Sequence, residues 1–170
     1  MGAGNYNQST RERVADINRG LIVQTSVFNN VTYIAIGATP IFTVYNRIRL
    51  YSLDLEAVTA FSNTATLLKW QFDQSTPAVA AFDITEAALT CAQIARGRRV
   101  CYVGTALDTA MVITVNPGCS LQTAAWMDIG GEGTIGTLDI IGAVAATSGT
   151  SIITLTYVPI SVGAYVESLV

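Results

Sequence analysis

Histidine is absent from this chain of 170 residues, and lysine occurs once, at Lys69. Without histidine the sequence lacks the general base of most catalytic triads and the commonest transition-metal ligand. Lys69 alternates with apolar neighbours, so we expect it to face solvent or an interface rather than the desolvated pocket that a Schiff-base lysine needs. The sequence therefore predicts a protein that is not an enzyme and that carries no cofactor.

Charged residues are also scarce: 12% of the chain is charged and 51% is hydrophobic, whereas about 25% charged is typical of soluble domains. The sequence has no uninterrupted run of the about 18 apolar residues that a membrane-spanning helix needs. A net charge of −3 argues against direct nucleic-acid binding. We therefore predict that much of the surface is buried against other protein chains, with neither a membrane nor a nucleic acid as partner.

The three cysteines, Cys91, Cys101 and Cys119, do not have the spacing of a metal site. We expect free, buried thiols, and the alternative is a Cys91–Cys101 bridge across a hairpin. The polar N-terminus lacks the apolar segment of a secretory signal, so we expect synthesis and use without Sec export.

From residue 21 onward the sequence has the composition of β-strands. Residues 21–27 and 31–36 are rich in β-branched side chains and flank Asn29-Asn30, which predicts a hairpin. The clearest period-two alternation places Leu68, Trp70 and Phe72 opposite Lys69 and Asp73. Residues 83–95 are ambiguous, and we expect a strand with one helical turn. Further strands are expected at 41–44, 47–55, 100–103, 111–115, 137–145 and 151–160.

Many short strands without intervening helices predict an all-β fold, either a β-sandwich or a jelly-roll-like barrel. Residues 1–20 are polar and have no sustained period, so we expect an extended N-terminal arm that contacts a partner. Residues 21–170 are predicted to form a single β domain.

Arginines and tryptophans are the candidate interface residues. Arg96, Arg98 and Arg99 surround Gly97 in an expected hairpin loop, which is either a solvated turn or a contact with an acidic partner. The tryptophans are expected in the core or an interface, with a sugar-stacking platform as the alternative. The predicted interface residues are Arg11, Arg13, Arg19, Arg96, Arg98, Arg99, Trp70 and Trp126.

Acidic residues offer two further hypotheses. Asp54 and Glu56 share one face of a strand, a pattern that fits a solvated face better than a glycosidase pair. Asp128, Glu132 and Asp139 lie around a glycine-rich segment and could supply calcium ligands, but we predict no metal site.

Residues 136–160 read GTLDIIGAVAATSGTSIITLTYVPI: a strand, a Thr-Ser-Gly turn, and a strand that ends in an aromatic-x-Pro sequence. This stretch resembles the C-terminal hairpin of phage virion proteins, and residues 41–49, 58–68 and 90–92 resemble the middle of those chains. Such proteins are similar to capsid cement or decoration proteins. The resemblance implies trimers seated on a capsid shell, and it implies no catalytic residues.

Together these observations predict a phage capsid cement or decoration protein that binds the major capsid protein and stabilises the mature head. We expect a homotrimer associated through apolar strand faces, made in the host cytoplasm and placed on the outer surface of the virion. The alternatives are another virion subunit, such as a head-tail adaptor or a tail or head-fibre base, and a carbohydrate-binding module that uses Trp70 or Trp126. A hydrolase that uses carboxylates is a further alternative.

Overall fold

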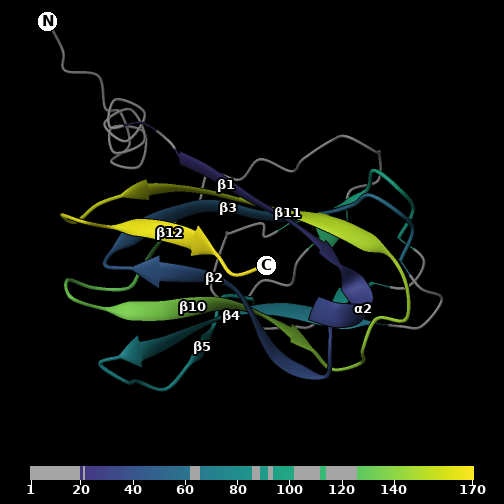
Figure 1. Ribbon diagram of the computed structural model, residues 1–170, viewed down its shortest axis with the longest axis horizontal. Coiled ribbons are helices and arrows are strands. Elements are labelled where there is room, and N and C mark those ends of the chain that lie inside the picture. The colour runs from purple at the N-terminus through teal and green to yellow at the C-terminus, as the bar shows by residue number, and fades with distance from the viewer. Residues whose placement is uncertain are drawn as a thin grey trace, which may run out of the picture.

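The computed structural model describes Gly20 and residues 22–61, 66–85, 89–91, 94–101, 112–113 and 126–170. These residues form two antiparallel β-sheets that face each other across a layer of apolar side chains (Figure 1). The predicted all-β sandwich is therefore confirmed. The arm predicted over residues 1–20 lies, apart from Gly20, outside the described residues.

In the described part of the chain, each sheet has six strands. Sheet A runs in the order β1 (Ile22–Asn29), β11 (Thr150–Pro159), β3 (Ile48–Ala57), β7 (Arg99–Cys101) and β8 (Val112–Ile113), and β9 (Met127–Ile129) also pairs with β3. Sheet B runs in the order β12 (Tyr165–Ser168), β2 (Gly37–Tyr45), β10 (Ile135–Gly142), β4 (Leu67–Thr76) and β5 (Phe82–Asp83), and β6 (Leu89–Thr90) also pairs with β4.

The order of the strands is that of a jelly roll, in which neighbouring strands of one sheet are far apart in sequence. The orders β1-β11-β3-β7 and β2-β10-β4-β5 interleave, because the chain crosses between the sheets at most of its connections. Strand β12 is an addition at the edge of sheet B, beside β2. The order in each sheet makes β1 and β12 edge strands, and these two edges contact each other.

Alternating side chains place the core between the sheets. In β4, Leu68, Trp70 and Phe72 are buried, while Lys69 and Asp73 are more exposed, so the alternation predicted for this strand is confirmed. Strand β11 follows the same rule, with Ile153 and Leu155 buried in the cluster of apolar side chains that both sheets share.

The hairpin predicted around Asn29-Asn30 is wrong. Strand β1 pairs along its whole length with β11, and the chain then enters the short helix α2 (Asn30–Tyr33). The Asn29 side chain accepts a hydrogen bond from the Val31 N–H at 2.9 Å, which caps that helix. An asparagine pair is suited to a helix start as well as to a tight turn, so local sequence did not distinguish the two.

The two other predicted hairpins are also wrong, although their strands exist. Strands β10 and β11 belong to opposite sheets, so residues 143–149 cross the sandwich rather than close a hairpin. The Arg96–Arg98 turn likewise joins β6 of sheet B to β7 of sheet A. Within residues 83–95 the described parts include short strands, and residues 86–88 and 92–93 lie outside the described residues.

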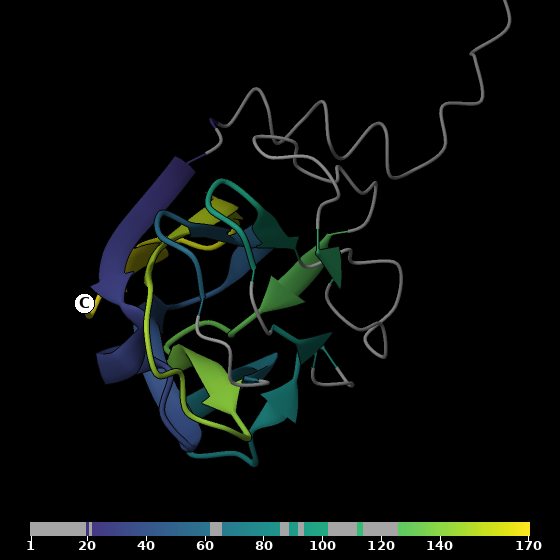
Figure 2. The ribbon, with the colours of Figure 1, turned by 90° about the vertical axis from the view of Figure 1, so that its right-hand side faces the viewer.

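The side of the sandwich that carries the edge strands also carries the C-terminus. Figure 2 shows β1, α2 and the last residues together on that side, and the Ser26 hydroxyl donates to the Val170 carbonyl at 2.8 Å. This bond joins the first described strand to the end of the chain and helps to close the gap between the two sheets.

Asn46 joins three loops at the opposite end of the sandwich from α2. Its φ of 60° places it in the left-handed region, which asparagine tolerates better than most residues. Its Nδ2 donates to the Gly163 carbonyl at 2.9 Å, and its Oδ1 accepts from the Gly133 N–H at 2.8 Å. The β2–β3 turn is therefore bonded to the loop before β10 and to the loop before β12.

Replacing Asn46 tests this anchor. We expect Asn46→Gly to lower the free energy of unfolding by about 1–3 kcal/mol, because two hydrogen bonds are lost while the backbone conformation is retained. Asn46→Ala should cost about 1 kcal/mol more, because alanine is strained at a positive φ. Urea unfolding measures both values, and a glycine variant as stable as the parent would contradict the anchor.

Candidate functional site

The predicted interface residues lie in different environments. Arg11, Arg13 and Arg19 lie outside the described residues. Trp70 is completely buried in the core from β4, so its ring has no surface to offer to a partner or a sugar. Trp70 therefore packs in the core, which was the alternative expected for it, and its prediction as an interface residue is wrong.

The Arg96–Arg98 turn projects from the edge of sheet A next to the end of β3. The Gly97 N–H donates to the Ala57 carbonyl at 2.7 Å, which fixes the turn, and Arg96 is exposed. Arg99 pairs with Glu56, the residue opposite it in the sheet, with an Nη2–Oε2 distance of 2.9 Å. In the described part of the chain, Arg96 and Arg98 have no ion pair, whereas the charge of Arg99 is largely used within sheet A.

Trp126 belongs to a compact cluster on the outer face of sheet A. The Arg49 Cζ atom lies 3.6 Å from the centroid of a Trp126 ring, which is the geometry of a cation–π contact. Arg49 also binds both oxygens of Asp128, at 2.7 and 3.1 Å, and Arg47 reaches the same carboxylate at 3.2 Å. One face of the indole is therefore covered by a guanidinium group of the same chain.

Asp54 and Glu56 point to the outer face of sheet A, but they are not equally solvated. Glu56 is held by Arg99, while Asp54 is only 8% exposed and its Oδ1 has no hydrogen-bond partner. Burial raises the pKa of the Asp54 carboxyl, and a hydrogen bond with Cys101 and the charge of Arg99 oppose that shift. The expectation of a solvated face is therefore wrong for Asp54, because β7 and β11 flank it on both sides.

The other candidates from sequence are not brought together. Among the residues that the structure describes, no group of three or more His, Cys, Asp or Glu side chains is placed to hold a metal ion. Cys91 and Cys101 are buried and are not joined by a disulfide, so the alternative of a bridge between them is wrong. Burial raises the pKa of the Cys91 thiol to about 12, which makes it a poor nucleophile. Cys119 lies outside the described residues.

The outer face of sheet B carries an acidic surface that sequence reasoning did not find. We define the acidic face as Asp73 on β4, Asp139 on β10 and Glu167 on β12, together with the tyrosine pair described next. Lys69 is the one cation on the same sheet among the described residues, and its ammonium pairs with Asp83 at 2.6 Å. The three carboxylates of the acidic face have no ion pair in the described part of the chain.

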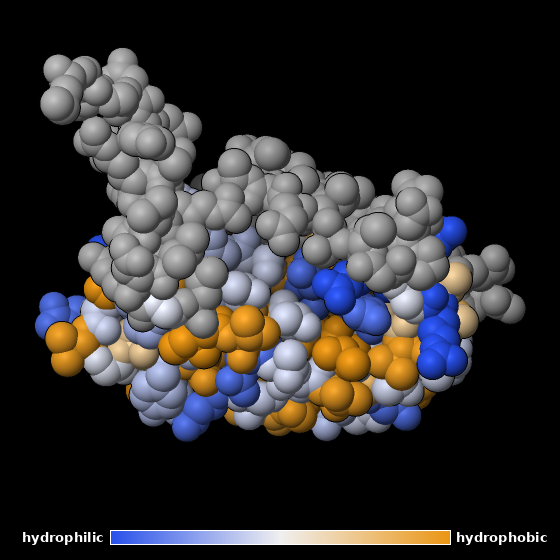
Figure 3. All heavy atoms as spheres, turned by 90° about the horizontal axis from the view of Figure 1, so that it is seen from above, coloured by the Kyte–Doolittle hydropathy of each residue, from blue (hydrophilic) through white to orange (hydrophobic). Residues whose placement is uncertain are grey.

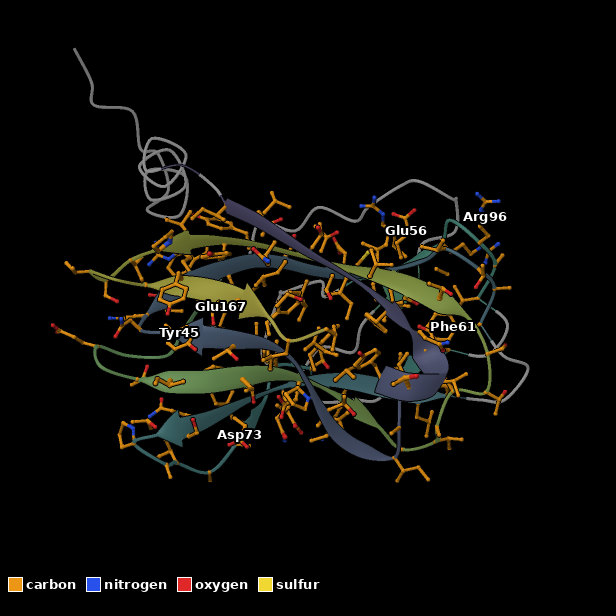
Figure 4. The ribbon with its side chains drawn as sticks, in the orientation of Figure 1. Tyr45, Glu56, Phe61, Asp73, Arg96 and Glu167 are labelled. Carbon is orange, nitrogen blue, oxygen red and sulfur yellow. The ribbon has the colours of Figure 1, made fainter. Side chains whose placement is uncertain are left out.

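The tyrosine pair of the acidic face consists of Tyr45 on β2 and Tyr165 on β12. The Tyr45 and Tyr165 rings are stacked, with centroids 4.3 Å apart and planes 12° apart. Figure 4 shows Tyr45 near Glu167 at the same end of the sheet. Partial burial raises the pKa of the Tyr45 hydroxyl, and a hydrogen bond with Glu167 raises it further. This pair was not predicted from the sequence, because no strand was expected at β12.

A strip of exposed apolar side chains follows the edge of the sandwich at β1 and α2. We define the edge strip as Val23 and Val27 on β1, Val31 on α2, and Ile36 after it; they are 58%, 63%, 50% and 75% exposed. In Figure 3, apolar side chains are visible along the lower border of the molecule, the side on which β1 and the C-terminus lie in Figure 2. An edge strand with apolar side chains is a preferred place for contact with another chain.

Comparison with protein-family models, with curated proteins and with solved structures found no match to this chain. Within the described ranges, no helix is long and apolar enough to cross a membrane.

The raised pKa of Asp54 predicts how stability depends on pH. A carboxyl whose pKa is higher in the folded state stabilises the fold below its unfolded pKa, and this contribution is lost as pH rises through the folded pKa. Asp54→Asn should therefore be more stable than the parent near pH 7 and should lose this advantage near about pH 3.

Unfolding by urea at both pH values measures this difference. The matched control is Glu132→Gln, which removes an exposed carboxylate and should change stability by less than about 0.5 kcal/mol at either pH. A stability difference for Asp54→Asn that does not grow with pH would contradict the assignment.

Proposed function

We propose that this protein is a structural subunit of a phage particle, specifically a capsid cement or decoration protein. The observation that carries the proposal is the edge strip on a jelly-roll sandwich that has few surface charges. Jelly rolls build viral capsid domains, but they also build lectins and cupins, so the fold alone does not decide the function. The exposed apolar edge favours a protein whose working state is an assembly.

In the proposed assembly, protomers associate through the edge strip as a homotrimer on the outer surface of the capsid. The major capsid protein is the partner, and residues 1–20 reach over the shell. The capsid would be stabilised by mass action, because a protein that binds only the assembled shell shifts the equilibrium towards that shell. Many equivalent sites on the shell multiply this stabilisation. The proposal assigns no catalytic step and no cofactor to the chain, which is made in the host cytoplasm.

Other virion subunits fit the same surface. A head-tail adaptor or a fibre base would share the apolar edge, and the copy number per particle distinguishes these from a cement protein. The carbohydrate-binding alternative has less support, because Trp70 is buried and Arg49 covers one face of Trp126.

A single charge in the edge strip tests the assembly. We expect Val27→Asp to convert the oligomer to monomers, because apolar burial worth about 1.5–3 kcal/mol per valine is lost and a carboxylate must be desolvated. Light scattering after size-exclusion chromatography measures the mass. Val162→Asp is the matched control, since Val162 is 95% exposed in the loop before β12 and its change should leave the mass unaltered. Equal masses for both variants and the parent would contradict the role of the edge strip.

Deletion of residues 1–20 tests the contact with the shell. We expect the shortened chain to keep its oligomeric mass and to lose binding to capsids stripped of accessory proteins, because the arm is proposed to contact the shell. Co-sedimentation with the stripped capsids measures the occupancy. Unchanged occupancy would show that the arm does not carry the contact.

A further inference from the structure

The acidic face contains more negative charge than its own chain neutralises. Register across four strands aligns Glu167 with Thr43, Thr43 with Thr137, and Thr137 with Asp73. Strands lie about 4.8 Å apart, so the two terminal carboxylates of this row are about 14 Å apart on one face. Lys69, which is the one cation of this sheet among the residues that the structure describes, is already bound to Asp83. The row therefore presents uncompensated carboxylates at both of its ends.

Asp139 adds a third carboxylate at the centre of the same face. Its neighbours in sequence, Leu138 and Ile140, point into the core, so Asp139 points outward. It is nevertheless only 4% exposed, and its Oδ1 has no hydrogen-bond partner. Burial raises the pKa of this carboxyl and Asp73 raises it further, although a hydrogen bond from Thr137 opposes the shift. A buried acceptor without a donor is a feature that a bound donor from outside the chain would relieve.

On sheet A, carboxylates and an aromatic ring are bound by arginine side chains. There Asp128 and the Trp126 ring hold the Arg49 guanidinium between them, and Glu56 holds Arg99. The acidic face of sheet B likewise has a carboxylate beside aromatic side chains, with Glu167 next to the stacked rings of Tyr45 and Tyr165. In the described residues, no guanidinium group of this chain lies on it.

We infer that the acidic face of sheet B is a docking surface for arginine side chains of a different protein chain. Guanidinium groups bind carboxylates through two parallel hydrogen bonds and stack on aromatic rings, which an ammonium group does less well. Glu167 and Tyr165 receive one guanidinium at the edge of the sheet, and Asp73 receives a second across the row. This inference rests on the proposed function, in which the partner is the capsid shell.

Titration with short peptides tests the surface without any capsid. Backbone amide NMR spectra of the full chain are recorded with tetra-arginine and then with tetra-lysine, at about 0.1 M salt so that long-range attraction is screened. We expect tetra-arginine to bind at least about tenfold more tightly than tetra-lysine and to shift signals of β12, β2, β10 and β4. Equal affinity for the two peptides, or shifts centred on sheet A, would overturn the inference.

Variants assign the contact to individual side chains. Glu167→Gln and Tyr165→Ala should each weaken tetra-arginine binding by about tenfold, because one loses the paired carboxylate and the other loses the stacked ring. Glu132→Gln changes the net charge equally but lies in the loop before β10, and it should change the affinity by less than about twofold. A control variant as weak as Glu167→Gln would show unspecific attraction and overturn the inference.

A second copy of this chain is the competing occupant, because Arg96 and Arg98 lack an ion pair in the described residues. Light scattering with and without tetra-arginine distinguishes the two. If the peptide dissociates the oligomer, and Arg96→Gln together with Arg98→Gln does the same, the face binds a second copy and a different chain is not its partner. An oligomer unaffected by the peptide supports the inference. Failure of the chain to bind capsids would reject the proposed function and leave the peptide result in place.

Discussion

Burial of one apolar face of each sheet against the other is the constraint on which the rest of this structure depends. Side chains alternate along a strand, so fixing Leu68, Trp70 and Phe72 inward fixes Lys69 and Asp73 outward. The same rule applies to β10 and β11, and to β3 on either side of the register shift between Leu50 and Ser52. A slip of one residue would expose the core, and the charges of both outer faces are therefore consequences of the core register.

The alternation also explains which parts of the fold were predictable. The strands near 47–55, 67–72, 137–145 and 151–160 have strong patterns, and all of them exist. Their partners were not predictable, because a period of two identifies a face and says nothing about which strand lies alongside. Three expected hairpins therefore became an N-capped helix and two crossings between sheets. Strand β12 was missed, since only four residues pair and only Val166 among them is buried.

The candidate surfaces were less predictable than the fold because their residues come from separate strands. Arg99 and Glu56 are 43 positions apart and meet only because β7 lies beside β3. The acidic face combines residues of β4, β10 and β12, none of which is adjacent to another in sequence. By contrast, the turn expected at Arg96 and Gly97 exists, and Arg96 is exposed there. Local signals predicted local features, and the pairing of distant strands produced the rest.

The two outer faces of the sandwich differ in how their charges are paired. Sheet A neutralises Glu56 and Asp128 with arginines of the same chain, whereas on sheet B Lys69 neutralises Asp83 and the three carboxylates of the acidic face have no ion pair in the described residues. The apolar edge strip lies at the edge strand between the two faces. A protein with these surfaces can make an apolar contact along one edge and a charged contact through one face, which are separate interactions with separate salt dependence.

The measurement that tests the central claim most directly is the heat stability of capsids stripped of accessory proteins, with and without this protein. Thermal opening is followed by light scattering while the protein is added in increasing amounts. The account predicts that the midpoint of opening rises with protein concentration and then reaches a plateau when the sites on the shell are full. An unchanged midpoint with the protein in excess would contradict a cement function.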